Sequence, residues 1–393
     1  MAKKLRVGIL FGGRSGEHEV SLLSAASILK AIDRSKFDVV PIGITKEGRW
    51  LAAADATGLL TGEPSDEARG LRAGDPAATP GARLLQEGMP MLMAPEPAAA
   101  SLSVGTPKRR LADKSSAIDV VFPVLHGTFG EDGTIQGLFE LAGIAYVGSG
   151  VLGSSAGMDK DAMKRLFAQA GLPIVKHVTI LRSEWEKSPR KAIAHIEAAL
   201  KYPLFVKPAN LGSSVGISKA HDRKELGPAL DEAAKYDRKL VVEQGVGGKK
   251  SRARELEVGV LGNDDPRASV VGEIIPGKEF YDYEAKYLSE GSVPVIPAKI
   301  TRDEAKKIRE MAVAAFQACD LSGLARVDFL MEPDGKRRIY LNEVNTLPGF
   351  TQISMYPKLW EAAGIPYTAL ITQLIELALE RHEDKNRNTY SRE

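Results

Sequence analysis

The chain has 393 residues, and its 53 basic and 51 acidic side chains leave a net charge of +2. This near-balance argues against a dedicated polyanion-binding surface such as a nucleic-acid interface, and the length predicts two or three domains. No stretch approaches the roughly 20 apolar residues of a membrane span, and the apolar run near the N-terminus is too short for a signal peptide. We therefore expect a cytoplasmic protein without a membrane partner.

Strand and helix patterns alternate over the first 150 residues. Apolar strand patterns at 5–11, 37–44 and 117–125 are separated by one amphipathic helix pattern at 19–32. This alternation predicts an α/β domain over 1–153 with a Rossmann-like parallel sheet.

Residues 52–117 interrupt that pattern with many Ala, Gly and Pro. They predict a partly loop-like insertion on the first domain, with a hairpin at 82–94. The insertion indicates nothing about chemistry.

The sequence pattern changes after residue 153. An amphipathic helix is expected at 159–171. Strand patterns follow at 174–181, 203–210 and 239–246, with a second helix at 189–200 between the first two strands. These elements predict a small α+β domain over 154–239, followed by a third domain over 240–393.

Two features of the third domain concern packing. Thr301 and Glu304 form a capping box ahead of a helix pattern at 305–318. Cys319 is the one cysteine of the chain, and its place after this helix favours buried packing over nucleophilic chemistry.

Polar residues interrupt an apolar strand pattern in the third domain, in the stretch YLNEVNTLPGFT at 340–351. Simple alternation places Glu343 and Asn345 on one face together with Ile339 and Leu341. A carboxylate and an amide on such a strand require an explanation beyond packing.

A second strand pattern upstream carries Arg326 and Asp328 on one face. The Asp-Gly pair at 334–335 predicts a two-residue hairpin turn between the two strands, which pairs Arg326 with Glu343 and Asp328 with Leu341. The two carboxylates and the nearby amide then converge around one arginine.

Two carboxylates and an amide oxygen are hard ligands that suit Mg²⁺ better than zinc. The sequence therefore predicts a metal site at Asp328, Glu343 and Asn345. Because Mg²⁺ commonly takes phosphate oxygens as further ligands, the site implies a nucleoside triphosphate. The alternative is a surface ion-pair network around Arg326. It is disfavoured because the strands are otherwise apolar and burying bare carboxylates is costly.

A second cluster lies in PLFVKPANLGSSVGISK, at 203–219. A strand that ends in Lys207 is followed by a loop of small residues at 212–216, where backbone N–H groups can approach phosphate oxygens. The strand–loop–strand order excludes a Walker A loop. A glycine-rich hairpin turn is the alternative, and the predicted metal site downstream favours phosphate binding.

Weaker signals extend the nucleotide site. The strand that ends at Glu243 and Gln244, together with Val246 beyond it, can meet an adenine edge through backbone groups. Glu255 can bind ribose hydroxyls, although its stretch ELEV is also an ordinary amphipathic strand.

The N-terminal domain carries a different polar pattern. Glu17 follows a Gly-Gly turn that opens a helix, and a carboxylate there argues for a cationic ligand such as an amino group. His126 follows a strand at the edge where parallel sheets bind ligands, so structural and binding roles are equally favoured. The polar, aromatic-rich residues 279–292 suggest a lid over the site; an exposed loop is the alternative.

Motifs in all three predicted domains together resemble the D-alanine–D-alanine ligase family of ATP-grasp enzymes. They are GGRSGEHEVS, LHGTFGEDGTIQG, MDK, VKPANLGSSVGISK, YDYEAKY, ARVDF and NEVNTLPGFTQISMYP. The similarity runs from residue 5 to about residue 380, with no motif matched in 52–117. The resemblance implies a three-domain ATP-grasp fold, ATP with two Mg²⁺ or Mn²⁺ ions, a homodimer and a role in peptidoglycan synthesis.

The resemblance also implies how the reaction proceeds. The carboxylate of one D-alanine attacks the γ-phosphorus of ATP to form an acyl phosphate. The amine of a second D-alanine then attacks that carbonyl carbon, and phosphate leaves.

The resemblance assigns roles to individual residues. The ATP-binding residues would be Lys160, Lys207, Ser213, Ser214, Val215, Glu243, Gln244, Val246, Glu255 and Asn342. Asp328, Glu343 and Asn345 would bind the metal ions. Arg326 and the backbone N–H of Gly349 would stabilise the developing oxyanion. The substrate-binding residues would be Glu17, His126, Lys286, Ser354 and Met355. Glu17, Ser213 and Tyr287 would hydrogen-bond to one another and close the lid over a water-sensitive intermediate.

Two positions bear on the product. Relatives that make D-alanyl-D-lactate differ in the lid and tend to place a basic residue near Met355. The presence of Tyr287 and of an apolar Met355 favours an amine nucleophile and hence the dipeptide. The alternatives are a D-alanine–D-lactate ligase, another ATP-grasp carboxylate–amine ligase, or a non-catalytic nucleotide-binding protein, which would be expected to have damaged ligands.

Overall fold

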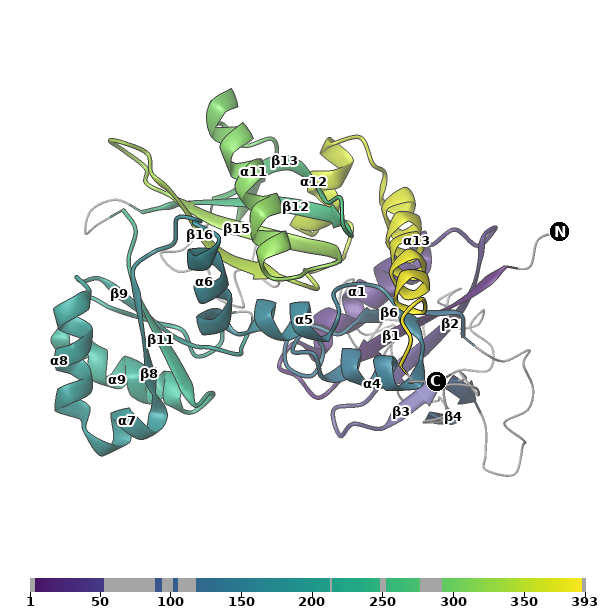
Figure 1. The fold of residues 1–393 in the computed structure, drawn as a ribbon, viewed down its shortest axis with the longest axis horizontal. Helices are drawn as coiled ribbons and strands as arrows, with labels where there is room; N and C mark the ends of the chain where they lie inside the picture. The colour runs from purple at the N-terminus through teal and green to yellow at the C-terminus, as the bar shows by residue number, and fades with distance from the viewer. Residues whose placement is uncertain are drawn as a thin grey trace, which may run out of the picture.

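The computed structural model describes residues 4–52, 89–93, 102–104, 118–212, 214–247, 252–275 and 292–390. Its strands form three sheets of seven, four and five strands (Figure 1). Two consecutive helices, α5 (Val151–Met158) and α6 (Lys160–Gln169), run between the seven-stranded sheet and the other two. The polar site described below lies where these parts meet.

The seven-stranded sheet has the order β5-β4-β3-β2-β1-β6-β7. Its strands are β1 (Leu5–Gly12), β2 (Phe37–Ile44), β3 (Trp50–Ala52), β4 (Met89–Met93), β5 (Leu102–Val104), β6 (Val120–Val124) and β7 (Ala145–Tyr146). Strands β2, β1, β6 and β7 are parallel, which confirms the predicted parallel sheet. The accompanying helices are α1 (His18–Ala31) and α4 (Thr134–Ala142).

The insertion extends this sheet with antiparallel strands. Most of the predicted hairpin at 82–94 lies outside the described residues, and its described part, 89–93, forms the strand β4. Its antiparallel partners are β3 and β5, which lie on either side in sequence and outside 82–94. Strand pairing at this edge is therefore set by segments that the local pattern does not connect.

The four-stranded sheet is antiparallel, with the order β10-β9-β11-β8. Its strands are β8 (His177–Leu181), β9 (Leu204–Pro208), β10 (Ser218–Ala220) and β11 (Lys239–Gln244). Its helices are α7 (Arg182–Lys187), α8 (Pro189–Ala199) and α9 (Arg223–Ala234). The apolar faces of these helices, including Ile196 and Leu230, pack with Leu240 and Val242 into one core.

The five-stranded antiparallel sheet has the order β14-β13-β12-β15-β16. Its strands are β12 (Arg254–Gly262), β13 (Arg267–Ile275), β14 (Val293–Val295), β15 (Gly323–Met331) and β16 (Ile339–Asn345). Helix α11 (Arg302–Ala318) begins at the predicted capping box, in which the Glu304 N–H donates to Thr301 Oγ1 at 3.2 Å. Cys319 is buried, as predicted, and burial raises the pKa of its thiol to about 12.

The predicted pairing of β15 with β16 is wrong by two residues at the polar positions. The turn is longer than two residues, because the Glu332 N–H still bonds to the Arg338 carbonyl oxygen at 2.9 Å. The register then shifts once more after Phe329, so that Asp328 opposes Glu343 and Arg326 opposes Asn345.

This second shift is a β-bulge that makes Asn342 the extra residue. A bulge reverses the alternation of the strand beyond it. Leu341 is therefore buried in the core with Val344, whereas Glu343 and Asn345 point to the opposite face. The expectation that Ile339 and Leu341 share a face with Glu343 is wrong for this reason.

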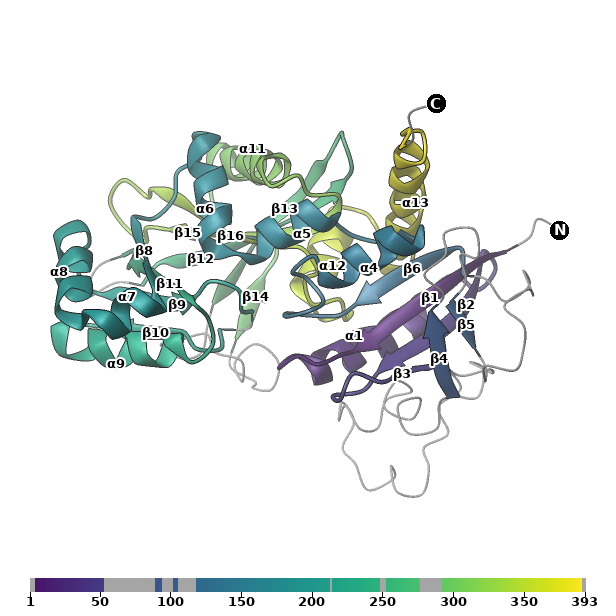
Figure 2. The ribbon, with the colours of Figure 1, turned by 60° about the horizontal axis from the view of Figure 1, so that its bottom comes forward.

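The C-terminal helices return to the first domain. α12 (Met355–Ala362) leads to α13 (Tyr367–Lys385), which lies beside β6 and β7 (Figures 1 and 2). Leu370 and Leu374 pack in the same core as Val7 and Ile9 of β1. The last helix of the chain thus ties the third predicted domain to the first, and the residue boundaries between the domains stay a prediction.

Within the described ranges, no single helix has the length and hydropathy of a membrane span. The pair α12 and α13 reaches them only when both helices are taken together, and the two are bent by 103° to each other.

Candidate active site

Four polar side chains gather on one face of the β15–β16 pair. Arg326 binds Asp328 through two hydrogen bonds of 2.7 Å, from Nε to Oδ1 and from Nη2 to Oδ2. Asn345 Nδ2 donates to the same Asp328 Oδ2 at 2.9 Å. Glu343 faces Asp328 across the strands. The predicted convergence is therefore present, although by a different register.

Glu257 is a fifth member of this cluster that the sequence analysis missed. It lies on β12 directly opposite Asp328, and its Oε2 is 3.2 Å from Arg326 Nε. Three carboxylates thus occupy one level of three neighbouring strands, with Arg326 beside two of them. The signal was available in the alternation of ELEV, which puts Glu255 and Glu257 on one face.

Lys160 connects this cluster to the loop of small residues at 212–216, the glycine-rich loop. Its Nζ donates to the Leu211 carbonyl oxygen at 2.9 Å and lies 3.5 Å from Glu343 Oε2. A small cavity of about 50 Å³ lies between them. Its lining combines loop, helix and strand residues, among them Lys160, Gly212, Ser214, Glu343 and Asn345. Predicted phosphate and metal positions therefore share one space.

A buried ion network lies behind that cavity. Glu243 is 3 % exposed, and its two oxygens lie 2.9 Å from Lys164 Nζ and 2.9 Å from Lys207 Nζ. Burial opposes ionisation of Glu243, but the two lysines hold its pKa far below the usual range. Lys164 also donates to the Asn342 carbonyl oxygen at 3.2 Å. Lys164 thus links Glu243 of the four-stranded sheet to Asn342 of the five-stranded sheet.

Lys164 was not predicted as a site residue. Burial lowers its pKa, whereas for Lys207 burial is outweighed by Glu243, so that the pKa of Lys207 is raised. The sequence did contain a signal for Lys164. It follows Lys160 by four residues on α6, and this spacing places both lysines on one face of the helix.

The other predicted nucleotide residues surround this network. Asn342 Oδ1 is buried without a hydrogen-bond partner among the described residues, which leaves an acceptor for a ligand. The Gln244 side chain instead accepts from the Lys201 N–H at 3.1 Å. Glu255 lies 3.1 Å from Arg252 and is close enough to raise the pKa of Lys207. Val246 is half-buried beyond β11.

Glu17 lies where the first domain meets the glycine-rich loop. It precedes α1 and is 8 % exposed. A Cβ atom added to Gly127 would lie 2.4 Å from Glu17 Oε2, and one added to Gly212 would lie 2.8 Å away. The carboxylate thus lies between Gly127 and Gly212, which belong to different predicted domains. Gly212 directly precedes Ser213 in the sequence.

His126 has partners on both ring nitrogens. Nδ1 lies 2.8 Å from the Leu347 carbonyl oxygen, and Nε2 lies 3.1 Å from Ser24 Oγ. Burial lowers the pKa of the imidazole, which favours its neutral form. These contacts support the structural role that was weighed for His126 and place it beside the loop after β16.

Glu131 holds the same loop from the other side. Its Oε1 accepts from the Leu347 N–H at 2.8 Å, and its Oε2 accepts from the Gly127 N–H at 2.8 Å. Burial, reinforced by the charge of Glu17, raises the pKa of Glu131 to about 7. Glu131 and His126 thus hold the backbone N–H and the backbone carbonyl of Leu347, which lies two residues before Gly349. Its motif, LHGTFGEDGTIQG, alone predicts no role for Glu131.

The predicted second-substrate residues follow that loop. Ser354 precedes α12, and its Oγ accepts from the Thr351 N–H at 3.1 Å. Met355 is buried against Ile274 and Leu359, and Gly349 is half-buried beyond the strand end.

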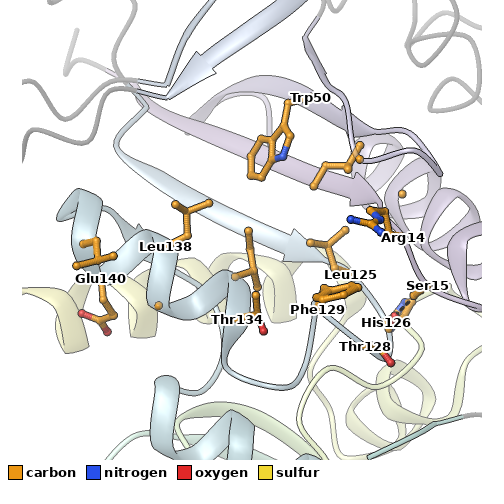
Figure 3. Close-up of a pocket in the computed structure, with 18 residues that line it drawn as sticks. Arg14, Ser15, Trp50, Leu125, His126, Thr128, Phe129, Thr134, Leu138 and Glu140 are labelled. Atoms are coloured by element: carbon orange, nitrogen blue, oxygen red, sulfur yellow. Dashed lines mark hydrogen bonds between the residues drawn. The ribbon is translucent and has the colours of Figure 1, made fainter. Parts of the chain in front are cut away.

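A second, larger cavity lies in the first domain, with a volume of about 770 Å³ (Figure 3). It is lined mainly by apolar side chains such as Trp50, Leu125 and Leu138, and Figure 3 shows Phe129 beside Arg14 at one end. The Arg14 guanidinium lies 5.7 Å from the centre of the Phe129 ring. This apolar lining does not suit a triphosphate, so the polar cluster is the better nucleotide site.

Three predicted residues, Ser213, Lys286 and Tyr287, lie outside the described residues, together with most of the predicted lid.

The residues present fit ATP and a divalent cation. Asp328, Glu343 and the Asn345 amide supply hard oxygen donors, and Lys160 and Lys207 supply charge for phosphates. In the described part of the chain, no three His, Cys, Asp or Glu side chains converge on one point. A cation here would therefore complete its coordination with water or phosphate, as Mg²⁺ commonly does.

Lys207 of the four-stranded sheet and Lys160 of α6 lie against the carboxylates of the five-stranded sheet. This arrangement defines the chain as an ATP-grasp enzyme, the class that the motifs predicted. Two family models match it: "D-ala D-ala ligase N-terminus" over residues 6–149 and "D-ala D-ala ligase C-terminus" over residues 166–376. The chain belongs to the D-alanine–D-alanine ligase family.

Individual relatives agree with that assignment. The D-alanine–D-alanine ligase of Geobacillus thermodenitrificans is 49% identical over 388 residues, which cover 99% of both chains. That of Natranaerobius thermophilus is 50% identical over 388 residues, 98% of each. Among solved structures, the Coxiella burnetii D-alanine–D-alanine ligase has a TM-score of 0.79 at 34% identity and covers 98% of this chain and 97% of its own. The VanG D-Ala:D-Ser ligase of Enterococcus faecalis has a TM-score of 0.78 at 34% identity, with 96% and 100% covered.

Proposed function

We propose that the chain joins two D-alanines to D-alanyl-D-alanine with ATP, through an acyl phosphate, and so supplies peptidoglycan synthesis. The observation that carries the proposal is the single space in which Lys160 and the glycine-rich loop face Glu343 and Asn345. Relatives named D-alanine–D-alanine ligase at 49–50% identity over nearly the whole chain support the substrate.

In the first step, the carboxylate of one D-alanine attacks the γ-phosphorus, and the bond to the β-phosphate oxygen breaks to release ADP. Lys160 and Lys207 neutralise phosphate charge, which is most of what phosphoryl transfer requires. Asp328, Glu343 and Asn345 would hold divalent cations, for which we propose two Mg²⁺ or Mn²⁺ ions. Bound there, such cations supply charge neutralisation at the phosphates.

In the second step, the amine of the other D-alanine attacks the acyl carbon, and phosphate leaves with one former carboxylate oxygen. Arg326 and the Gly349 N–H would stabilise the tetrahedral oxyanion. Glu17 would hold the ammonium group of the first substrate, with His126 fixing the neighbouring loop.

The remaining predicted residues complete the proposal. Ser354 and Lys286 would receive the carboxylate of the second substrate beside Met355, and Tyr287 and Ser213 would join Glu17 when the lid closes. ATP use and the family support a cytoplasmic homodimer.

A competing product is D-alanyl-D-serine, because the VanG D-Ala:D-Ser ligase is as similar in structure as the Coxiella enzyme. The apolar Met355 and the D-alanine–D-alanine ligase relatives favour D-alanine as the second substrate. D-Lactate is not favoured.

Phosphate release from ATP tests the proposal with D-alanine alone, and with D-alanine plus D-serine, D-lactate or L-alanine. We expect D-alanine-dependent release and D-alanyl-D-alanine as the main product at neutral pH. A depsipeptide at neutral pH, or no D-alanine-dependent turnover, would refute the assigned substrate. Replacing Glu343 by Gln should abolish turnover and preserve the circular dichroism spectrum; near-normal rates would refute the metal assignment.

A further inference from the structure

Arg326 lies between two carboxylates. It holds both oxygens of Asp328 at 2.7 Å, and its Nε is also 3.2 Å from Glu257 Oε2. All three side chains are largely buried, with 17%, 15% and 10% of the Arg326, Asp328 and Glu257 side chains exposed. Pairing at this depth is stronger than on the surface because solvent screens it less.

This arrangement conflicts with the proposed roles of its members. Asp328 is proposed to hold a divalent cation, yet Arg326 occupies both of its oxygens and Asn345 donates to one of them. Arg326 is proposed to meet the substrate's oxyanion, yet its Nε and Nη2 are directed at Asp328. Both proposed roles require Arg326 to release Asp328.

Glu257 is placed to receive the released guanidinium. It lies on the neighbouring strand at the level of Asp328, on the same face of the sheet. Glu257 Oε2 already lies 3.2 Å from Arg326 Nε, so the guanidinium can change its partner with a small movement.

We propose that Glu257 is a positioning residue that takes over Arg326 when Asp328 turns to a divalent cation. Arg326 then keeps one buried carboxylate partner throughout and remains beside the substrate carbonyl. The inference rests on the proposed metal site and adds to it a change of partner within the chain.

Glu257→Gln tests the exchange, because glutamine preserves the size of the side chain but removes its charge. Without the charge of Glu257, Arg326 binds Asp328 more strongly, so we expect Mn²⁺ to bind about tenfold more weakly in the presence of a non-hydrolysable ATP analogue. Electron paramagnetic resonance of free Mn²⁺ measures this affinity without turnover. In the steady state, kcat should fall more than the KM for ATP, and Glu257→Asp should recover part of both losses.

A double-mutant cycle separates the exchange from a simple loss of negative charge. In an Arg326→Met background there is no competing guanidinium, so Glu257→Gln should change Mn²⁺ affinity by less than about twofold. Equal weakening in both backgrounds, or no weakening in either, would overturn the exchange while leaving the metal site in place. Unchanged Mn²⁺ binding in Asp328→Asn would overturn the metal site itself. Circular dichroism spectra and thermal midpoints verify that each variant is folded.

Discussion

Charged side chains in this site are stabilised by oppositely charged partners that are also buried. Glu243 is ionised in a buried position because Lys164 and Lys207 each lie 2.9 Å from one of its oxygens. Removing one partner of such a group costs more than the pair contributes, since it leaves a buried charge without compensation. The same holds for Asp328 beside Arg326. Each side chain therefore depends on neighbours from other strands and helices.

Lys164→Met should destabilise the four-stranded sheet by about 3 kcal/mol, because Glu243 loses one of its two buried cations. Faster hydrogen exchange of the β9 and β11 amides would report this loss. Lys235→Met is a matched control, since its pair with Glu232 at 2.6 Å is exposed and should contribute little to stability. Equal effects of the two substitutions would contradict the importance of the buried network.

Glu131 predicts a pH dependence of stability. Its pKa is raised to about 7 from an ordinary 4.5, so the folded protein binds a proton more tightly than the unfolded chain. Protonated Glu131 therefore contributes to the free energy of unfolding, on the order of 3 kcal/mol in total. This stabilisation is fully present below pH 4.5 and is lost as the pH rises through 7. Glu131→Gln should remove this slope from urea-unfolding measurements between pH 5 and 8. An unchanged slope would show that another group is responsible.

At the scale of elements, regular patterns were predictable and local irregularities were not. The parallel strands β1, β2 and β6 follow from short apolar runs, and the capping box of α11 follows from two residues at fixed spacing. The pairing of β4 with β3 and β5 depends on contacts across the insertion, which no local pattern encodes.

The bulge at Asn342 shows most clearly why the site was only partly predictable. The residue types Asp328, Glu343 and Asn345 indicated a hard-cation site, and that inference depends on chemistry rather than on register. Simple alternation, however, would direct Glu343 and Asn345 toward the core side of Leu341. One extra residue turns them to the face of Asp328, and sequence alone gives no signal for where a strand bulges. The alternation of ELEV puts Glu257 on one face of β12, but only the tertiary pairing of β12 with β15 places it opposite Asp328, which is why it was missed.

At the scale of the whole molecule, the site is assembled where separate parts of the chain meet. Glu17 of the first domain lies against Gly212 of the glycine-rich loop, while Glu131 and His126 hold Leu347 after β16. Helix α13 packs the end of the chain back onto the first sheet. The relative placement of the parts is therefore itself a condition for the proposed substrate contacts.

Gly212→Ala tests this meeting point. An added Cβ would lie 2.8 Å from Glu17 Oε2, so the carboxylate must shift. We expect the KM for the first D-alanine to rise about tenfold with little change in thermal midpoint, because small misplacements of positioning groups are costly for catalysis. Gly137→Ala is the control: its Cβ would meet no atom within 4 Å, and a helical alanine should slightly stabilise α4. An unchanged KM in Gly212→Ala would contradict the role of this contact.

The central claim is that a D-alanine carboxylate is phosphorylated at the cluster of Lys160, Glu343 and Asn345 and is then attacked by an amine. D-Alanine labelled with ¹⁸O in its carboxylate tests it most directly, with mass spectrometry of the phosphate released from ATP. We expect one ¹⁸O atom in each phosphate, one phosphate per dipeptide, and no labelled phosphate from Glu343→Gln. Unlabelled phosphate from the unsubstituted chain would contradict the acyl phosphate, and labelled phosphate from Glu343→Gln at a normal rate would contradict the site.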